Sequence, residues 1–204
     1  TYTPASNAFG TANVTVYLTD SGASTGSNHN QSASVVFRIT VAPVNDQPTF
    51  VPGEDQQTLE DSGTQSVSGW ASGLYAGAAN EAEQTYAFAV SNNQPSLFGA
   101  EGQPAITPDG TLTYTPAVDA FGEAVVTVVL TDNGGTSNGG VDTGNTVTFV
   151  IEVLPVNDRP SFTDQGDIIV MEDEGAVSKP WVVANSIFVG RANESQTHTF
   201  AIEA

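Results

Sequence analysis

The sequence predicts an all-β protein built from tandem Greek-key β-sandwich modules of about 112 residues. Three observations support this prediction: a long internal repeat, an apolar period of two within each repeat, and turn-forming residues between the apolar runs. The 204 residues contain no long amphipathic helical pattern. Both the fold class and the domain size therefore follow from the repeat and from what lies inside it.

The internal repeat extends through the whole chain. The string TYTPASNAFGTANVTVYLTDSG at 1–22 matches TYTPAVDAFGEAVVTVVLTDNG at 113–134. The string PVNDQPTF at 43–50 returns as PVNDRPSF at 155–162, and both matches are shifted by 112 positions. A period of this length is too long for one turn of a solenoid and suits one small domain per repeat.

The Val-Asn-Asp string predicts the domain boundaries. If it closes each domain, residues 1–46 are the C-terminal part of a first module, residues 47–158 are a complete module, and residues 159–204 begin a third. Each end piece is then a half-domain that would expose a core face. We expect neighbouring chain of a longer polypeptide to complete these halves, and completion by a second molecule is the alternative.

Alternating apolar and polar residues predict the strands. In VTVYLTD, Val14, Val16 and Leu18 lie on one face, and FRITV at 37–41 alternates in the same way. This pattern is typical of half-buried strands.

Three further stretches connect or interrupt these strands. Asp109-Gly110 predicts a tight turn before a strand, and WASGLYAGAANEAEQ at 70–84 predicts a short helix or a long loop. The loop at 131–146 is polar and rich in glycine, so we expect a solvated hairpin tip.

The charge balance excludes one class of partner. The chain has 23 acidic residues and 4 basic ones, yet charged residues make up only 13% of it, against about 25% in an average protein. Lysine and arginine are therefore scarce, and the four that occur are scattered. Since nothing gathers enough positive charge to neutralise phosphates, we expect no nucleic-acid partner.

Other absences in the sequence narrow the chemistry. There is no cysteine, so disulfides, thiolate metal sites and a cysteine nucleophile are excluded. No apolar run approaches the roughly 20 residues of a membrane helix, so we expect no membrane insertion in this segment. The sequence offers no nucleophile–base pair, phosphate loop or cofactor motif, and we predict that it is not an enzyme.

Taken together, the strings PVNDQP, PVNDRP, GTLTYTP and LTDNGG carry a family resemblance. The chain resembles the tandem cadherin-like, immunoglobulin-like repeats of bacterial surface proteins and large adhesins. The resemblance covers the entire chain. It implies an extracellular, cell-surface or secreted location, a structural or adhesive role, and calcium (Ca²⁺) at the linkers between repeats.

Calcium suits these linkers for a physical reason. An array of domains bends at its linkers unless something ties neighbours together, and Ca²⁺ takes about 6–8 oxygen ligands that two domains and a linker can share. Proline on both sides of each Val-Asn-Asp string restricts the linker to extended backbone. Asn-Asp beside proline is also ordinary turn chemistry, so a plain turn remains the alternative.

The resemblance implies one ligand set for each junction between modules. The set for the junction after the complete module is Glu60, Asp119, Asn157, Asp158 and Glu194. The set for the junction before it is Asn45, Asp46, Glu81 and Asp132. Asp61 and Asp173 are additional candidates, and Glu172 is the first-strand acid of the third module. Pro43 and Pro155 replace an acid of the cadherin pattern, so we expect fewer ions per junction than in cadherins.

Two other functions stay open at this point. A carbohydrate-binding module array would bind surface glycans through Trp70 and Tyr75, although recurring aromatics such as Trp70 and Trp181 also suit a sandwich core. A filament subunit would associate with other copies of itself by strand complementation. In the leading interpretation, the partners are neighbouring repeats of the same polypeptide.

Overall fold

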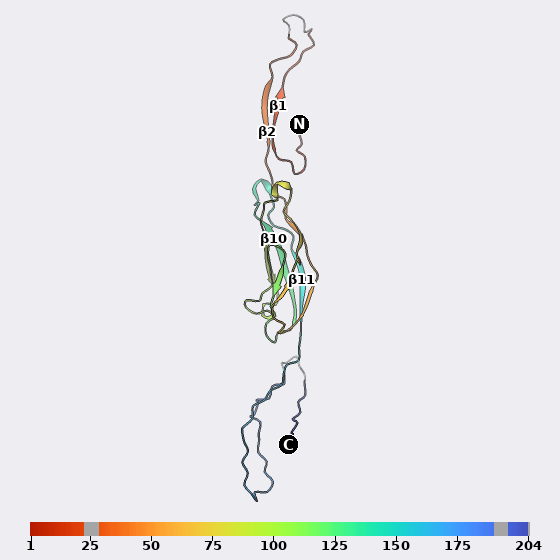
Figure 1. Cartoon of the computed structure of the whole chain (residues 1–204). Coiled ribbons are helices and arrows are strands. Elements are labelled where there is room, and N and C mark those ends of the chain that lie inside the picture. The colour runs from red at the N-terminus through yellow and green to blue at the C-terminus, as the bar shows by residue number, and fades with distance from the viewer. Residues whose placement is uncertain (23–28, 190–195, 204) are drawn as a thin grey trace.

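The computed structural model describes residues 1–22, 29–189 and 196–203, and the described part is all-β, as the sequence predicts. Figure 1 shows an elongated arrangement, with the β1–β2 hairpin at one end and the chain after β11 at the other. None of the described residues forms a helix long and apolar enough to cross a membrane. The elements are β1 Gly10–Val16, β2 Val35–Val41, β3 Thr49–Val51, β4 Gln56–Leu59, β5 Gln65–Val67, β6 Ser72–Tyr75, η1 Ala79–Glu81, β7 Tyr86–Asn92, η2 Pro95–Leu97, β8 Ala105–Ile106, β9 Leu112–Tyr114, β10 Gly122–Asp132, η3 Ser137–Gly139 and β11 Val147–Leu154, where η denotes a 3₁₀ helix.

The central region, residues 47–158, contains three sheets. The largest has the strand order β4-β11-β10-β7, in which β10 is antiparallel to β11 and β7, and β4 is parallel to β11. A three-stranded sheet has the order β5-β9-β8, and β3 pairs with β6. In the largest sheet, β4 comes first along the chain and β11 comes last. These two strands lie side by side and run in the same direction.

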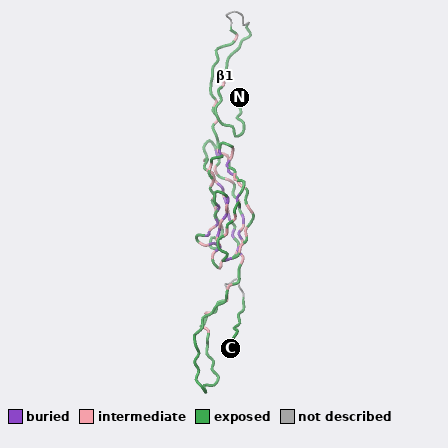
Figure 2. Tube along the Cα trace, in the orientation of Figure 1, coloured by how far each residue is buried: buried purple, intermediate pink, exposed green. Residues whose placement is uncertain are grey.

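The hydrophobic core lies in this central region and takes side chains from both larger sheets. Alternate residues of β10, among them Val126 and Val128, are fully buried, while their neighbours are more exposed. They pack with Leu112 and Tyr114 of β9. Burial of each large aliphatic side chain stabilises the fold by about 1.5–3 kcal/mol. Figure 2 shows that the buried residues concentrate here.

Trp70 belongs to this core. Its side chain is 2% exposed, its ring packs on Phe149 with a centroid distance of 4.2 Å, and its Nε1–H donates to the carbonyl of Glu54 at 3.0 Å. The interpretation of Trp70 as a core residue is confirmed. Glycan binding required an exposed Trp70 beside Tyr75, and only Tyr75, which is 51% exposed, meets that requirement.

The predicted turn at Asp109-Gly110 is also confirmed. The Gly110 N–H donates to the Thr107 carbonyl at 2.8 Å, and its φ of +87° lies in the left-handed region that favours glycine. A Cβ at this position would lie 1.9 Å from the Ala71 carbonyl oxygen. The Thr107 hydroxyl donates to the Asp109 carboxylate and lowers the pKa of that group.

The stretch at 70–84 contains more structure than the sequence predicts. It includes η1, in agreement with the short helix that we expect, but it also includes strand β6, which pairs with β3. The sequence Ser-Gly-Leu-Tyr of β6 has no alternating pattern long enough to reveal a strand. Pairing with β3 supplies the hydrogen bonds that local propensity does not predict.

The β1–β2 hairpin repeats the β10–β11 hairpin in detail. Gly10 pairs with Val41 and Val16 with Val35, which is the register of β10 and β11 shifted by 112 residues. Strand β2 contains the predicted FRITV, whereas β1 ends at Val16 and shares only residues 14–16 with the predicted VTVYLTD. The apolar face of the pair is not half-buried. Phe37 is 49% exposed and Leu18 is 76% exposed, because no second sheet covers this face.

The described residues after Asp158 form isolated bridges rather than strands. Ser161 pairs with Phe188 and Asp164 pairs with Val182. The ring of Phe162 contacts that of Phe200 edge to face, at a centroid distance of 5.3 Å. This segment holds local contacts but no buried core of its own.

Candidate metal centre

Parallel pairing of β4 with β11 brings two acidic stretches to one end of the central region. The chain leaves β4 at Glu60-Asp61 and leaves β11 toward Asn157-Asp158, and the Glu60 N–H donates to the Leu154 carbonyl at 2.9 Å. Because both strands end at the same edge of the sheet, residues about 95 positions apart in sequence become neighbours. The ligand candidates from both stretches therefore meet at this end.

Three carboxylates gather at this end, and we call Asp61, Asp119 and Asp158 the acidic triad. One oxygen from each lies within 4.8 Å of the other two. Asp61 is exposed, and the other two are half-buried. At about 4 Å, two like charges repel by roughly 1 kcal/mol in water and by more where the protein excludes water. A divalent cation between them converts this repulsion into attraction.

Two members of the triad have an unusual backbone conformation that positions their side chains. Asp61 and Asp119 adopt left-handed φ values of +60° and +55°, a conformation that aspartate tolerates better than most residues. The Asp61 carboxylate accepts the Asp119 N–H at 3.1 Å. This contact ties the turn after β4 to the loop before β10, so both turns hold their carboxylates at fixed positions.

Glu60, at the same end, has a buried carboxylate whose hydrogen bonding is incomplete. Its side chain is only 3% exposed. Oε1 accepts the Val156 N–H at 2.7 Å, whereas Oε2 is buried without a hydrogen-bond partner. An orphaned buried carboxylate oxygen costs on the order of 1–3 kcal/mol or more. An oxygen-seeking cation would satisfy it, so the residues at this end fit calcium in chemical type.

At the opposite end of the central region, the four residues predicted for the preceding junction also lie together. The Asn45 side-chain amide donates to Asp132 Oδ1 at 3.0 Å and to the Val141 carbonyl at 2.7 Å. Glu81, 4% exposed, accepts the Asp46 N–H at 3.3 and 3.4 Å through its two oxygens. Hydrogen bonds to amide and backbone N–H groups hold this end together.

Gln84 is part of this network, and the sequence analysis missed it. Its Nε2 donates to Asn45 Oδ1 at 2.7 Å. Its Oε1 and Asp132 Oδ2 are both buried without a hydrogen-bond partner. The signal was present in the repeat, since Gln196 stands 112 positions after Gln84 and donates to Asn157 in the same way.

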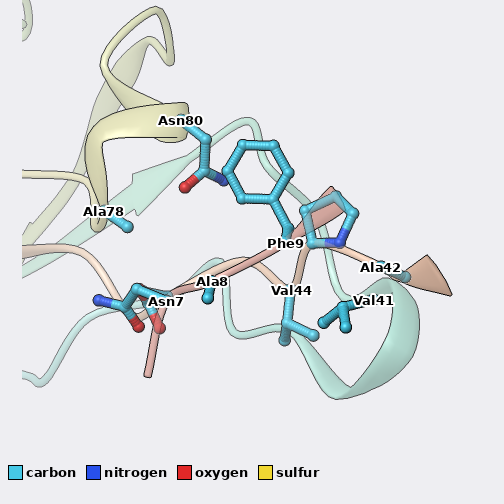
Figure 3. Close-up of a pocket in the computed structure, with 10 residues that line it drawn as sticks. Asn7, Ala8, Phe9, Val41, Ala42, Val44, Ala78 and Asn80 are labelled. Atoms are coloured by element: carbon cyan, nitrogen blue, oxygen red, sulfur yellow. The ribbon is translucent and has the colours of Figure 1, made fainter. Parts of the chain in front are cut away.

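A cavity of about 170 Å³ lies beside this network. Figure 3 shows lining residues from the loop at 7–9, the linker at 41–46 and the turn at 78–80. Asn7 lines it at the repeat position of Asp119, with a matching φ of +56°. The first junction therefore has an amide where the second has a carboxylate.

The remaining candidates are not gathered into a site. Glu172 and Asp173 are exposed in the segment that follows the central region. Asp173 nevertheless has a φ of +62°, close to that of Asp61 in the preceding repeat. Asn157 is exposed, and its side-chain amide donates to the Asp158 carbonyl at 3.1 Å. Glu194 lies outside the described residues.

The arrangement suits ion binding, because carboxylate and amide oxygens converge from separate segments at each end. Comparison of the chain with protein-family models, curated proteins and solved structures finds no match in any of the three.

Proposed function

We propose that this chain is a non-enzymatic stretch of an extracellular tandem-repeat protein in which calcium stiffens the junctions between Greek-key β-sandwich modules of about 112 residues. Face-to-face burial between the four-stranded and three-stranded sheets supports the sandwich architecture. The repeat supports the module length. The resemblance to cadherin-like bacterial adhesin repeats supports a cell-surface or secreted location.

The acidic triad is the observation that carries the proposal. It joins the turn after β4, the loop before β10 and the linker after β11. Only the linker residue Asp158 belongs to the path toward the next module. An ion held by all three therefore fixes the direction in which the chain leaves the central region. Pro155 and Pro160 limit the backbone conformations of the linker before and after Asp158.

Calcium titration of the 204-residue chain by calorimetry tests this proposal. We expect at least one ion to bind, with a dissociation constant in the range of about 10⁻⁴–10⁻³ M that is typical of extracellular modules. Small-angle scattering with calcium should give a narrower distribution of lengths than scattering with chelator. Asp158→Asn should weaken binding at least tenfold and remove the calcium effect on length.

A matched control separates site-specific binding from the general acidity of the chain. Glu101 is an exposed carboxylate outside the acidic triad, and Glu101→Gln should leave calcium uptake unchanged. If the two variants bind calcium equally, the Asn-Asp pairs are proline-stiffened turns, and the proposal is wrong.

A further inference from the structure

The linker after β2 is fastened to the central region by hydrogen bonds of Asn45. Its backbone carbonyl accepts the Val141 N–H at 3.0 Å, and its side-chain amide donates to the Val141 carbonyl at 2.7 Å. The same amide donates to Asp132, and Gln84 donates to Asn45 Oδ1. All of these partners belong to the region that follows the linker in the chain.

The next residues of the linker are held by the same region. The Asp46 N–H donates to Glu81, whose side chain is only 4% exposed. The Gln47 side-chain amide donates to the Thr143 carbonyl at 3.1 Å. Pro48, which follows, is fully buried. Protein groups alone make these hydrogen bonds.

Glycines of the central region leave room for residues 45–48, which we call the anchored segment. A Cβ on Gly140 would lie 2.9 Å from the Cβ of Asn45, and a Cβ on Gly77 would lie 2.8 Å from the Cβ of Asp46. Any larger residue at these two positions would collide with the linker. The surface of the central region is therefore fitted to the anchored segment.

The residues just before the anchored segment lack this fit. Residues 42–44 lie between the end of β2 and the anchored segment, and all three are exposed. They line the cavity of Figure 3, whose walls also include the loop at 7–9 and the turn at 78–80. The volume of this cavity, about 170 Å³, gives the β1–β2 hairpin room to tilt against the central region.

We propose that the anchored segment belongs to the module that follows it and needs no metal ion to stay there, so that the junction bends at residues 42–44. The structural unit then begins at Asn45, two residues earlier than the Val-Asn-Asp string predicts. One repeat later, Gln196 donates to Asn157 as Gln84 donates to Asn45. This second bond supports the same arrangement at the next linker.

The inference rests on the proposed function for the role that it leaves to calcium. Because the following module already holds the Asn-Asp pair, an ion has only to tie the preceding module to that pair. Asp46 lines the cavity together with Asn7 of the preceding module. In the acidic triad, likewise, Asp158 comes from the linker and the other two members come from the module before it.

Amide hydrogen exchange of the 204-residue chain in chelator, followed by NMR, tests the anchoring. We expect the Val141 N–H to exchange about 100-fold more slowly than the Val44 N–H, and calcium to change the Val141 rate by less than about twofold. Fast exchange of Val141 in chelator would overturn the proposal. If no calcium binds and Val141 is still protected, the proposed function fails and the anchoring stands.

A matched pair of variants tests whether Asn45 is the anchor. Asn45→Asp keeps the shape of the side chain but replaces its N–H donor with a carboxylate oxygen facing Asp132. Val141 should then exchange at least about tenfold faster in chelator, while Val128 in the core of β10 stays protected. Asn157→Asp, the same change at the exposed counterpart, should leave the Val141 rate unchanged. Equal effects of the two variants would overturn the proposal.

Nitroxide labels test the position of the bend, since the chain has no cysteine and accepts labels only at introduced ones. Thr15→Cys on β1 and Ala89→Cys on β7, both exposed, report the distances between the hairpin and the central region. Pro43→Gly should widen the distance distribution by about half and leave the Val141 exchange rate unchanged. An unchanged distribution, or Val141 exchange as fast as in Asn45→Asp, would overturn the proposal.

Discussion

The two ends of the central region carry the same Pro-Val-Asn-Asp string and use it differently. At the first end, Asn45 lies inside a part-buried network of amides, with Gln84 and Asp132 as partners. At the second end, the string leads to an acidic triad in which Asp61 is exposed. The difference lies in the neighbours: the loop position that holds Asn7 in one repeat holds Asp119 in the next. The same linker string therefore lies among amides at one end and among carboxylates at the other.

The largest expected effect comes from removing the amide at the first end. Asn45→Ala deletes three hydrogen bonds and takes away the side-chain partner of Gln84 Nε2 and of the Val141 carbonyl, so we expect a loss of about 2–3 kcal/mol in the free energy of unfolding. Asn157→Ala, at the exposed counterpart, should cost less than about 1 kcal/mol. Urea unfolding in chelator measures both, and equal losses would show that the two ends are energetically alike.

The next effect concerns calcium at the second end. Asp119→Asn gives this junction the amide that the first repeat has at Asn7, and asparagine keeps the left-handed turn. At calcium about 100 times the dissociation constant, the ion stabilises the native chain by about 2.7 kcal/mol. The variant should lose most of that increment and unfold normally in chelator. Thermal melting with and without calcium checks this, and an undiminished calcium shift would contradict it.

A glycine at the first end offers a steric test of the comparison. A Cβ on Gly134 would lie 1.8 Å from Asn45 Oδ1, so Gly134→Ala should displace the amide and cost about 1–3 kcal/mol. The repeat counterpart Gly22 would place its Cβ 2.9 Å from the carboxylate of Asp20, an exposed side chain that can rotate away. Gly22→Ala should therefore fall within about 0.5 kcal/mol of the parent chain. Urea unfolding of both variants ranks them, and a reversed order would refute the steric argument.

The smallest effect is a gain of function. Asn7→Asp adds a carboxylate to the cavity that Asp46 and Asn80 also line, and we expect calcium affinity at the first junction to rise about threefold. Calorimetry should show this gain in a background of Asp158→Asn, where binding at the second junction is already weakened. Asn30→Asp, a change of the same charge on a half-buried residue that does not line the cavity, is the control.

Sequence reasoning worked where structure is local or repeated. The alternation in FRITV placed β2, that in VTVYLTD found β1 but placed its end four residues too late, and Asp109-Gly110 placed a turn. The resemblance brought Asn45, Asp46, Glu81 and Asp132 into one group, and they lie close together. Whether any of them binds calcium stays a prediction.

Sequence reasoning failed where the outcome depends on a distant partner. Strand β6 exists because β3 pairs with it, and no pattern within its four residues predicts that. Exposure of the β1–β2 face depends on which segment covers it, and alternation alone says only which face is apolar. The contact of Gln84 with Asn45 could have been predicted from the sequence, because the spacing of Gln84 to Gln196 repeats that of Asn45 to Asn157.

The parallel pairing of β4 with β11 also determines how the central region would respond to a force that pulls on its two ends. Tension enters the largest sheet through the start of β4 and leaves through the end of β11, at opposite ends of two neighbouring parallel strands. Pulling therefore shears all of their hydrogen bonds at once, and they cannot open one after another as in a peeled hairpin. If the chain has the structural role proposed above, this pairing would make the central region resist extension along the chain, and rupture under force should begin at other contacts before this pair separates.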